Sequence, residues 1–490
     1  MRHTLIGIDR NADDPLYRQV RRAIEHAISS GIFDAQHRLP SSRELAIALA
    51  VSRNTVNMAY QELIAEGYVR SHERSGMFVN PGMFSMSATE NRATVPHIDW
   101  SARIRSRADI DIPEIEKTHD WYRYPYPFVV GQVDVRSFPA QAWVRHLRDA
   151  LDPPHAYASL QDSVATDDPM LVNAIRQELL LSRGVEASPD EILVTVGSQH
   201  GLDLVSRVLL GPDRQVAVEN PGYLDARHIF VRTGATVTGV DVDEYGLRPP
   251  ETLAGTDLLY VTPSHHHPTN VTLSIDRRRR LLALSGESGT VVVEDDYDSE
   301  FRYQGSPSPA LKALDDTGDI VYLGTFSKFL APGLRVGYLV GPPDLVRELR
   351  DVRRYGIRHP PGHIQRALAL FIDSGNYSRA LRHHRTKMKR KWEQTVAAVG
   401  EFLPFDTGSF PPGGVSLWVT GPPELDCEEL AVLARHRGVL IERGDIFYMQ
   451  DKPPRNTFRI GYGAIALRSI APGIKVLGDC CAELLGHSGR

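Results

Sequence analysis

Between residues 190 and 340, short runs of apolar and β-branched residues alternate with longer stretches in which apolar residues recur every three or four positions. The runs read EILVTVG, QVAVEN, LLYVTPS, TVVVEDD, DIVYLGTF and LRVGYLV, with helical stretches such as SQHGLDLVSRVLL and DRRRRLLALSGES between them. Strands that are apolar along their whole length are typically buried on both faces. The alternation therefore predicts an α/β unit in which helices cover both sides of a mainly parallel sheet.

The pattern changes on either side of this region. Residues 1–80 show helical periodicity followed by alternation, which is typical of short helices and a small ribbon. Residues 81–123 have turn formers and scattered charges without a sustained period, so we expect a linker with one short helix. The segments GGVSLWVT, GVLIERG and TFRIGYG predict a smaller α+β part near the end. We therefore expect one domain over residues 1–80 and another over 124–490, which divides near residue 350.

Composition limits the classes of protein to which the chain can belong. Single cores stop growing near roughly 250 to 300 residues, so a chain of 490 residues needs at least two domains. With 42% hydrophobic and 24% charged residues, disorder and a disulfide scaffold are excluded. A net charge of −5 gives no general attraction to nucleic acid or to anionic membranes. Three cysteines without CxxC spacing, and the lack of a long apolar run or signal peptide, predict a cytoplasmic protein.

Two capped helices across a tight turn are predicted within LPSSRELAIALAVSRNTVNMAYQELIAEG. Ser41 or Ser42 can cap the first helix and Ser52 the second, and a first helix of the domain starts near Pro15. The expected apolar faces are Leu45, Ile47, Ala48 and Leu49 in one helix and Val56, Ala59, Tyr60, Leu63 and Ile64 in the next. The segment RSHERSGMFV predicts a β-ribbon wing. Spacing alone leaves open both a DNA-reading helix-turn-helix and a hairpin used for packing.

The stretches LPSSREL, VSRNTV, AYQELIAEGYV and RSGMFV resemble the winged-helix domain of the GntR superfamily over nearly its whole length. The resemblance implies that double-stranded operator DNA is a partner. It also implies which residues face the DNA: Arg43, Ser52, Arg53, Asn54, Thr55, Asn57, Ser75 and Gly76. Residues 1–80 hold 10 Arg against 9 acidic residues, so DNA binding depends on these placed side chains and not on net charge.

The strongest chemical signal is the pair of segments EDDYDSEF and GTFSKFLAPGLRVGY. Carboxylates at the end of a buried strand are costly unless they meet a cation, and a protonated heterocyclic nitrogen is such a cation. Lys328 follows another buried strand, and Thr325, Ser327 and Arg335 beside it are suited to binding a phosphate. A lysine for a Schiff base, an acid for a pyridinium and a phosphate cradle together predict pyridoxal 5'-phosphate as cofactor.

Three other segments agree with this prediction. GSQHGLD lies at a strand-to-helix turn, where free N–H groups can hold a phosphate. ENPGY ends a strand with Tyr223, which can stack on a pyridine ring, and Arg459 on a late apolar strand suits a carboxylate ligand. Taken singly, each feature also has a structural interpretation. Lys328 can be a strand-end lysine, Tyr223 a core aromatic and Arg459 half of a structural ion pair.

The order and spacing of these segments resemble fold-type I aminotransferases from about residue 125 to 480. The resemblance implies that Lys328 forms the Schiff base, Asp295 pairs with the ring nitrogen and Tyr297 hydrogen-bonds the phenolic oxygen. It implies further cofactor contacts from Ser198, Gln199, Thr325, Ser327 and Arg335 at the phosphate and from Tyr223 on the ring. Arg459 would receive a substrate or effector carboxylate.

Two segments depart from the usual pattern of such proteins. SHHHPTN has Asn270 where a glycine is common and His267 before the proline, which makes His267 a candidate for the effector pocket. SVATDDPMLVNAIR replaces a tyrosine-glycine segment, so the phosphate contact that a neighbouring subunit often donates is not assigned. Consecutive histidines on an extended segment point to alternate sides, so His265, His266 and His267 predict no metal site. The basic runs DRRRR and RHHRTKMKRKW are expected to be solvated helix faces.

A winged helix joined through a linker to an aminotransferase-like domain is the architecture of the MocR/GabR subgroup of the GntR regulators. The resemblance implies a transcription regulator that senses pyridoxal phosphate, an amino acid or an amine. A head-to-tail homodimer without net turnover is expected. Two alternatives stay open. One is an active aminotransferase with an accessory DNA-binding domain, and the other is a DNA-binding module on an inert scaffold, against which the intact Lys328 argues. The effector and the operator are not predicted.

Overall fold

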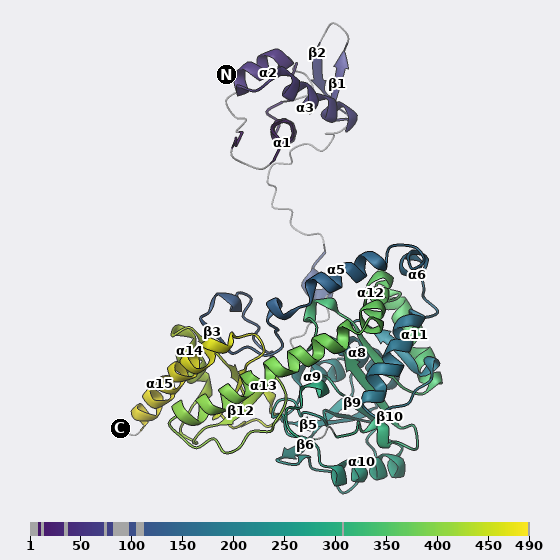
Figure 1. Cartoon of the computed structure of the whole chain (residues 1–490), viewed down its shortest axis with the longest axis vertical. Helices are drawn as coiled ribbons and strands as arrows, with labels where there is room; N and C mark the ends of the chain where they lie inside the picture. The colour runs from purple at the N-terminus through teal and green to yellow at the C-terminus, as the bar shows by residue number, and fades with distance from the viewer. Residues whose placement is uncertain are drawn as a thin grey trace. The chain divides into compact units, whose positions relative to one another are not determined.

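The computed structural model describes residues 8–10, 14–33, 38–72, 76–81, 98–103, 112–305 and 308–488. They form two compact units, one within residues 1–106 and one within residues 107–490 (Figure 1). A short helix, α4 (Trp100–Arg103), lies inside the expected linker. The linker limits of 81 and 123 stay a prediction, because residues 82–97 and 104–111 lie outside the described ranges.

The N-terminal unit is a helix-turn-helix followed by a ribbon. Its elements are α1 (Leu16–Ser29), α2 (Ser42–Leu49), α3 (Arg53–Ala65), β1 (Val69–His72) and β2 (Gly76–Val79), and the two strands pair antiparallel. Ser41 caps α2 in a reciprocal capping box with Glu44, and the Ser52 side chain accepts from the Thr55 N–H at the start of α3. The predicted capping residues and the winged-helix fold are therefore confirmed.

The predicted apolar face of α2 was partly wrong. Leu45 and Ala46 are buried, whereas Ile47 is 74% exposed and Ala48 is exposed too. In a helix each residue turns the side chain by about 100°, so a helix of two turns can bury one narrow stripe only. The position of α3 selects that stripe, because the Tyr60 hydroxyl of α3 donates to the Pro40 carbonyl just before α2, at 2.7 Å.

The C-terminal unit contains a large sheet part and a smaller part. Its helices are α5 (Ala140–Asp149), α6 (Ala156–Leu160), α7 (Pro169–Ala174), α8 (Ser198–Leu209), α9 (Leu224–Val231), α10 (Ile275–Ser288), α11 (Pro343–Ile357), α12 (Gly362–Asp373), α13 (Asn376–Phe402), α14 (Cys427–His436) and α15 (Ile470–Ser488). Its strands are β3 (Tyr126–Pro127), β4 (Ile192–Thr195), β5 (Gln215–Asn220), β6 (Thr236–Asp243), β7 (Gly246–Leu247), β8 (Leu258–Val261), β9 (Val291–Asp295), β10 (Ile320–Thr325), β11 (Gly337–Val340), β12 (Ser416–Thr420), β13 (Val439–Leu440), β14 (Glu442–Arg443) and β15 (Thr457–Gly461).

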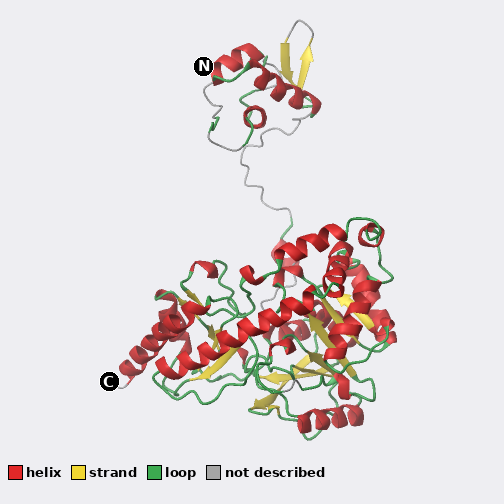
Figure 2. Cartoon of the chain, in the orientation of Figure 1, coloured by secondary structure: helices red, strands yellow, loops and turns green. Residues whose placement is uncertain are grey.

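The large sheet confirms the predicted α/β architecture. Its strand order is β4-β11-β10-β9-β8-β5-β6-β7, with parallel pairing from β10 to β6 and antiparallel pairing of β11 with both of its neighbours. Helices lie on both sides of the strands (Figure 2). Successive residues of β9 face opposite sides of the sheet, and both sides are covered. Val293 packs with residues of α8, α9 and α11, whereas Val292 packs with residues of α10.

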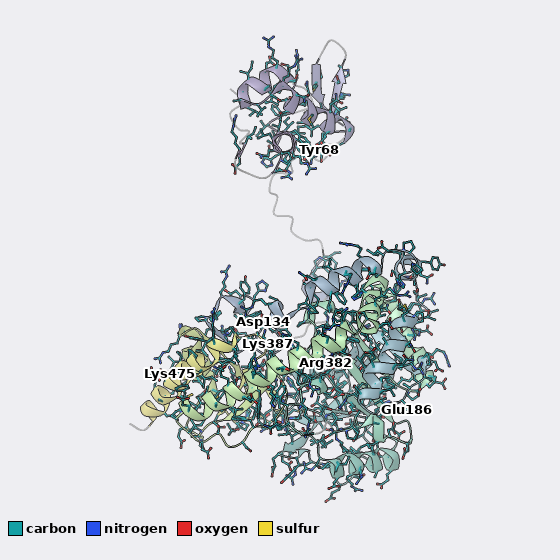
Figure 3. All side chains as sticks on the ribbon, viewed as in Figure 1. Tyr68, Asp134, Glu186, Arg382, Lys387 and Lys475 are labelled. Atoms are coloured by element: carbon teal, nitrogen blue, oxygen red, sulfur yellow. The ribbon has the colours of Figure 1, made fainter. Side chains whose placement is uncertain are left out.

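The smaller part has a sheet of order β12-β15-β14, a separate pairing of β13 with β3, and the helices α14 and α15. The cysteines Cys427, Cys480 and Cys481 are free and buried there. The long helix α13 is fixed to the chain before α5 by an ion pair between Lys387 and Asp134, at 2.8 Å, and both residues are labelled in Figure 3. Over the described residues, each helix is too short or too polar to span a bilayer.

One arginine and one lysine of the basic runs are buried and not solvated, contrary to expectation. Arg278 of α10 is fully buried, and its guanidinium donates to the carbonyls of Leu273, Pro263 and Pro309. Lys391 of α13 is also buried and donates to the Gly463 carbonyl at 2.6 Å. Long cationic side chains can be buried when carbonyl oxygens satisfy their donors, and a run of charges in a sequence does not reveal such partners.

Candidate functional site

The predicted cofactor residues meet at one edge of the large sheet. β5, β8, β9 and β10 run parallel, and β4 has the same direction because two antiparallel pairings separate it from β10. Their carboxyl ends therefore lie along one edge, which is where ligands bind in open α/β sheets. Asp295 is the last residue of β9, and the segments that follow the other strands carry Ser198, Tyr223, His267 and Lys328.

Lys328 follows β10 and is half-buried. Its Nζ lies 5.5 Å from the centre of the Tyr297 ring. Burial lowers the pKa of the Lys328 ammonium, and of the nearby charges Arg459 acts in the same direction while Asp298 and Asp295 oppose it. A lowered pKa increases the fraction of neutral amine, which is the form that reacts with a carbonyl carbon.

Asp295 ends β9 and is almost fully buried. The Tyr260 hydroxyl donates to its Oδ2 at 2.9 Å, and its Oδ1 is without a hydrogen-bond partner among the described residues. Burial raises the pKa of Asp295 to about 7, although the Tyr260 bond and the charge of Lys328 act against the rise. A buried carboxyl group with one unused oxygen is suited to a ligand that brings a proton or a positive charge.

The expected phosphate residues gather around the start of α8. Ser198 is the first residue of α8, where backbone N–H groups are free, and Gly197 before it has φ of +86°. Arg335 donates from Nη2 to the Val196 carbonyl at 2.9 Å, and a Cβ atom on Gly197 would come within 2.8 Å of that Nη2. Gln199 Nε2 lies 3.4 Å from Asp225 Oδ2, so it borders the same turn. Glycine at position 197 therefore keeps this turn open.

Thr325 is the last residue of β10, and Ser327 follows it by two positions. The Ser327 N–H donates to Thr325 Oγ1 at 3.2 Å. Ser327 Oγ is buried and has no partner in the described part of the chain.

Three aromatic rings border the site. The His267 ring meets the Tyr223 ring edge-on at 5.0 Å and the Tyr297 ring at 6.1 Å. The Tyr223 hydroxyl donates to Asp225 at 3.1 Å, whereas the buried Tyr297 hydroxyl has no hydrogen-bond partner within the described ranges.

These observations test whether the residues fit pyridoxal phosphate. Among the described residues, the buried polar atoms without a hydrogen-bond partner include Asp295 Oδ1, Tyr297 Oη and Ser327 Oγ. A pyridinium nitrogen, a phenolic oxygen and a phosphate oxygen are the groups that these three atoms would satisfy, and Lys328 lies beside the Tyr297 ring. The site therefore fits the cofactor.

Arg459 differs from the expectation of a free carboxylate receptor. It is 1% exposed on β15, and its Nη1 donates to Glu442 Oε2 at 2.7 Å. Nη1 also lies 3.1 Å from His267 Nε2, and Nη2 donates to Ser416 Oγ at 3.1 Å. The structural ion pair, which the sequence left open, is thus present, and its partner Glu442 was missed. The only signal for it in the sequence is a charged residue at the end of the apolar run GVLIE.

The three consecutive histidines point to three different partners. His265 pairs with Asp298 at 2.9 Å, His266 contacts Thr269 and the Pro221 carbonyl, and His267 meets Arg459. No group of potential metal ligands is present among the described residues.

The two unusual segments have structural roles. Asn270 has φ of +63°, a left-handed conformation that asparagine tolerates, and its amide donates to the Ser416 carbonyl. Asp167 pairs with Arg350 at 2.8 Å and with Arg353 at 2.6 Å, and Asp168 caps α7 and pairs with Arg366. These carboxylates therefore fasten the chain before α7 to the helices α11 and α12.

Residues 112–118, which the sequence placed in the linker, contact both parts of the C-terminal unit, and we call them the strap. The Pro113 carbonyl lies 3.1 Å from His228 Nε2 in the large part, and Glu116 pairs with Arg435 of α14 at 2.7 Å. The strap also lines a cavity of about 540 Å³ together with Glu442. Lys117 is near enough to the site for its charge to lower the pKa of Lys328.

The residues expected to read DNA lie at the start of α3 and around it. Arg43, Ser52, Arg53 and Asn54 are exposed, whereas Thr55 and Asn57 are half-buried. The Arg53 Nε donates to Ser42 Oγ at 3.2 Å, which links α3 to α2. Gly76 begins β2 with φ of +104°, and Ser75 lies outside the described residues.

Comparison with known proteins gives a family match for each of the two units. The profile for bacterial regulatory proteins of the gntR family matches residues 16–79, and the profile for aminotransferase class I and II matches residues 131–467. The chain is 39% identical to the HTH-type transcriptional regulator TauR of Rhodobacter capsulatus, over 94% of this chain and 95% of that protein. It is 32% identical to the probable rhizopine catabolism regulatory protein MocR of Rhizobium meliloti, over 96% and 95%. The structure is similar to Pyrococcus horikoshii kynurenine aminotransferase, crystallised with PMP, with a TM-score of 0.72, 28% identity, and coverage of 79% and 98%.

Proposed function

The chain belongs to the MocR-type subgroup of the GntR transcription regulators, and from this premise we propose that its pyridoxal phosphate site reports the presence of a small amine to DNA. The protein is a pyridoxal phosphate-dependent regulator whose N-terminal unit binds DNA. The proposal adds that the C-terminal unit senses an amino acid or amine and changes how the helix-turn-helix engages its operator.

We propose one role for each residue of the site. Lys328 holds the cofactor covalently, Asp295 holds a proton on the ring nitrogen and Tyr297 donates to the phenolic oxygen. Other residues hold the phosphate and the ring: Ser198, Gln199, Thr325, Ser327 and Arg335 the phosphate, and Tyr223 the ring. The bound cofactor supplies an electrophilic carbon that reacts reversibly with primary amines. The observation that carries this proposal is a set of buried atoms near Lys328 that have no hydrogen-bond partner in the described part of the chain: Asp295 Oδ1, Tyr297 Oη and Ser327 Oγ.

Footprinting on the DNA upstream of the gene and its neighbours tests the proposal. Wild-type protein is compared with and without pyridoxal phosphate and candidate amines. We expect specific protection whose pattern changes when an amine is added. Lys328→Ala should lose the visible absorbance of the bound cofactor and the response to amines. Protection that is identical in every condition would contradict the sensing role.

On the DNA side, we propose that Arg43, Ser52, Arg53, Asn54, Thr55 and Asn57 contact the operator together with Ser75 and Gly76 of the wing. The exposure of Arg43, Ser52, Arg53 and Asn54 supports this assignment. An Asn54→Ala variant should weaken binding to the protected sequence more than binding to unrelated DNA, which a competition assay measures. Equal losses on both would show that Asn54 does not read bases.

We also propose a head-to-tail homodimer in the cytoplasm, with the DNA-binding domain over residues 1–80, the linker over 81–123 and the cofactor domain over 124–490. Exposed apolar side chains on α6 and at the end of α11 support an interface: Tyr157, Leu160 and Tyr355 are 79%, 69% and 83% exposed. Sedimentation of the wild type and of Tyr355→Asp tests it, with a loss of dimer expected in the variant.

An active aminotransferase is the second candidate, since Lys328 and Asp295 are both in place. The ion pair between Arg459 and Glu442 disfavours it, because a substrate carboxylate must compete with a carboxylate of the chain. Sustained turnover of an amino donor and a keto acid at rates typical of enzymes would establish this function instead.

A further inference from the structure

Glu442 and Arg459 are directly opposite residues on the paired strands β14 and β15. Their side chains form an ion pair of 2.7 Å, in which the Arg459 side chain is 2% exposed and that of Glu442 is 15% exposed. The buried guanidinium is therefore neutralised by the chain itself. A ligand anion cannot use Arg459 as a free cation.

The ion pair leaves part of Arg459 unused. Glu442 accepts from Nη1 alone, Ser416 accepts from Nη2, and Nε has no partner among the described residues. A guanidinium binds a carboxylate best through two N–H groups at once. A ligand carboxylate that engages two N–H groups would thus bind Arg459 more completely than Glu442 does.

Glu442 also has a place to which it can move. Its side chain lines the cavity of about 540 Å³ that is bordered by the strap and α14. The cavity is polar, with Lys117, Arg435 and Arg443 on its lining beside Glu114, Glu116 and Glu428, so a displaced carboxylate would enter water among charges of both signs. The register of β14 on β15 fixes the backbone, and only side-chain torsions need to change.

We propose, building on the sensing function above, that Glu442 is a displaceable counter-ion for Arg459 and determines the ligand class of the pocket. The ligand is a primary amine that also carries a carboxylate, and this carboxylate replaces Glu442 on Arg459 while the amine faces Lys328. Glu442 sets the affinity by competing for the guanidinium. It makes the pocket discriminate weakly between an amino acid and the matching amine that lacks a carboxylate.

The test compares a series of ω-amino acids of increasing chain length, each beside the alkylamine of the same length. Dissociation constants are measured by calorimetry and by the change in visible absorbance of the cofactor-loaded, full-length protein. In Glu442→Gln, we expect binding of the amino acid of best-fitting length to strengthen about tenfold or more, because the competing charge is gone. Binding of the matching alkylamine should change little.

Two further variants make the result specific. Glu428→Gln removes another carboxylate that lines the cavity and pairs with Arg443 and Arg455, and it should leave both affinities unchanged. Arg459→Gln should remove the higher affinity of the amino acid relative to the matching alkylamine. If Glu442→Gln does not fold, Glu442→Asp serves instead, because its shorter side chain weakens the same contact. It should shift the ratio of amino acid affinity to alkylamine affinity in the same direction.

The outcomes separate this inference from the sensing function on which it rests. Suppose that the ligands bind, but that the ratio of amino acid affinity to alkylamine affinity is the same in the wild type and in Glu442→Gln. This result would overturn the counter-ion role and leave sensing intact. A stronger response to the alkylamine than to the amino acid in the variant would overturn it as well. Failure of all ligands to bind the cofactor-loaded wild type would refute the sensing function and this inference together.

Discussion

Replacing Asp295 by Asn should make the cofactor-free protein less sensitive to pH. The pKa of Asp295 is raised by burial to about 7, from an ordinary value near 4. A carboxyl group with a raised pKa binds its proton more tightly in the folded protein than in the unfolded chain. Stability from this group is therefore greatest at low pH and falls as pH rises toward 7. Between about pH 5 and pH 8 the loss amounts to about 2 to 3 kcal/mol.

Asn has nearly the same shape and can still accept from the Tyr260 hydroxyl, but it cannot ionise. Urea denaturation of the cofactor-free wild type and of Asp295→Asn at several pH values measures the difference. Two neighbours also titrate in this range, since burial raises the pKa of Glu219 to about 8 and that of Glu294 to about 7. For this reason the quantity to compare is the difference between the two slopes and not either slope alone.

The expected result is a variant that matches the wild type near pH 5 and is more stable by about 2 to 3 kcal/mol near pH 8. Bound pyridoxal phosphate should reduce the difference, because its ring nitrogen gives the carboxylate a positive partner. Parallel pH profiles of the two cofactor-free proteins would refute the reasoning, since they would mean that Asp295 ionises in the folded protein as easily as in water.

Three smaller predictions concern stability. Ser52→Ala removes the cap of α3 and should lower the unfolding free energy of the N-terminal unit by about 1 kcal/mol in urea denaturation; an unchanged midpoint would contradict the capping role. Asn270→Ala loses the bond to the Ser416 carbonyl at a left-handed position and should cost about 1 to 3 kcal/mol, whereas Asn270→Gly keeps the backbone unstrained and should cost less, as thermal melts would show. Lys387→Met removes one partner of Asp134, whose pKa is lowered by Arg136 and Lys387 despite its burial, and should cost about 1 kcal/mol at neutral pH. This last effect should disappear as pH falls below about 4, because the folded-state advantage of a depressed carboxyl pKa is lost on protonation; a cost that persists there would refute the ionic origin.

The predictable parts of the fold are those with local causes. Ser41 and Ser52 were predicted as caps because the capping bond joins residues three positions apart. Asp295, Tyr223 and Lys328 meet because parallel strands place their carboxyl ends at one edge, although from the sequence their common site was implied by the resemblance to fold-type I aminotransferases. Ile47 was misplaced because tertiary packing against α3 decides which stripe of a short helix is buried.

The parts that could not be predicted depend on contacts between distant residues. Glu442 faces Arg459 only because β14 pairs with β15 in one register, and nothing in either segment specifies that register. Arg278 and Lys391 are buried because carbonyl groups of other segments accept from them. The strap has no periodicity, so its sequence is typical of a linker although its ends are held by His228 and Arg435.

The strap also has a thermodynamic consequence. It is continuous in sequence with the chain that leads to the helix-turn-helix, it contacts both the large and the small part, and it lines the cavity of about 540 Å³ beside Glu442. If a ligand changes the free energy of operator binding through this segment, the operator must change the free energy of ligand binding by the same amount. The coupling can therefore be measured from either end, and DNA itself becomes an effector of the amine site.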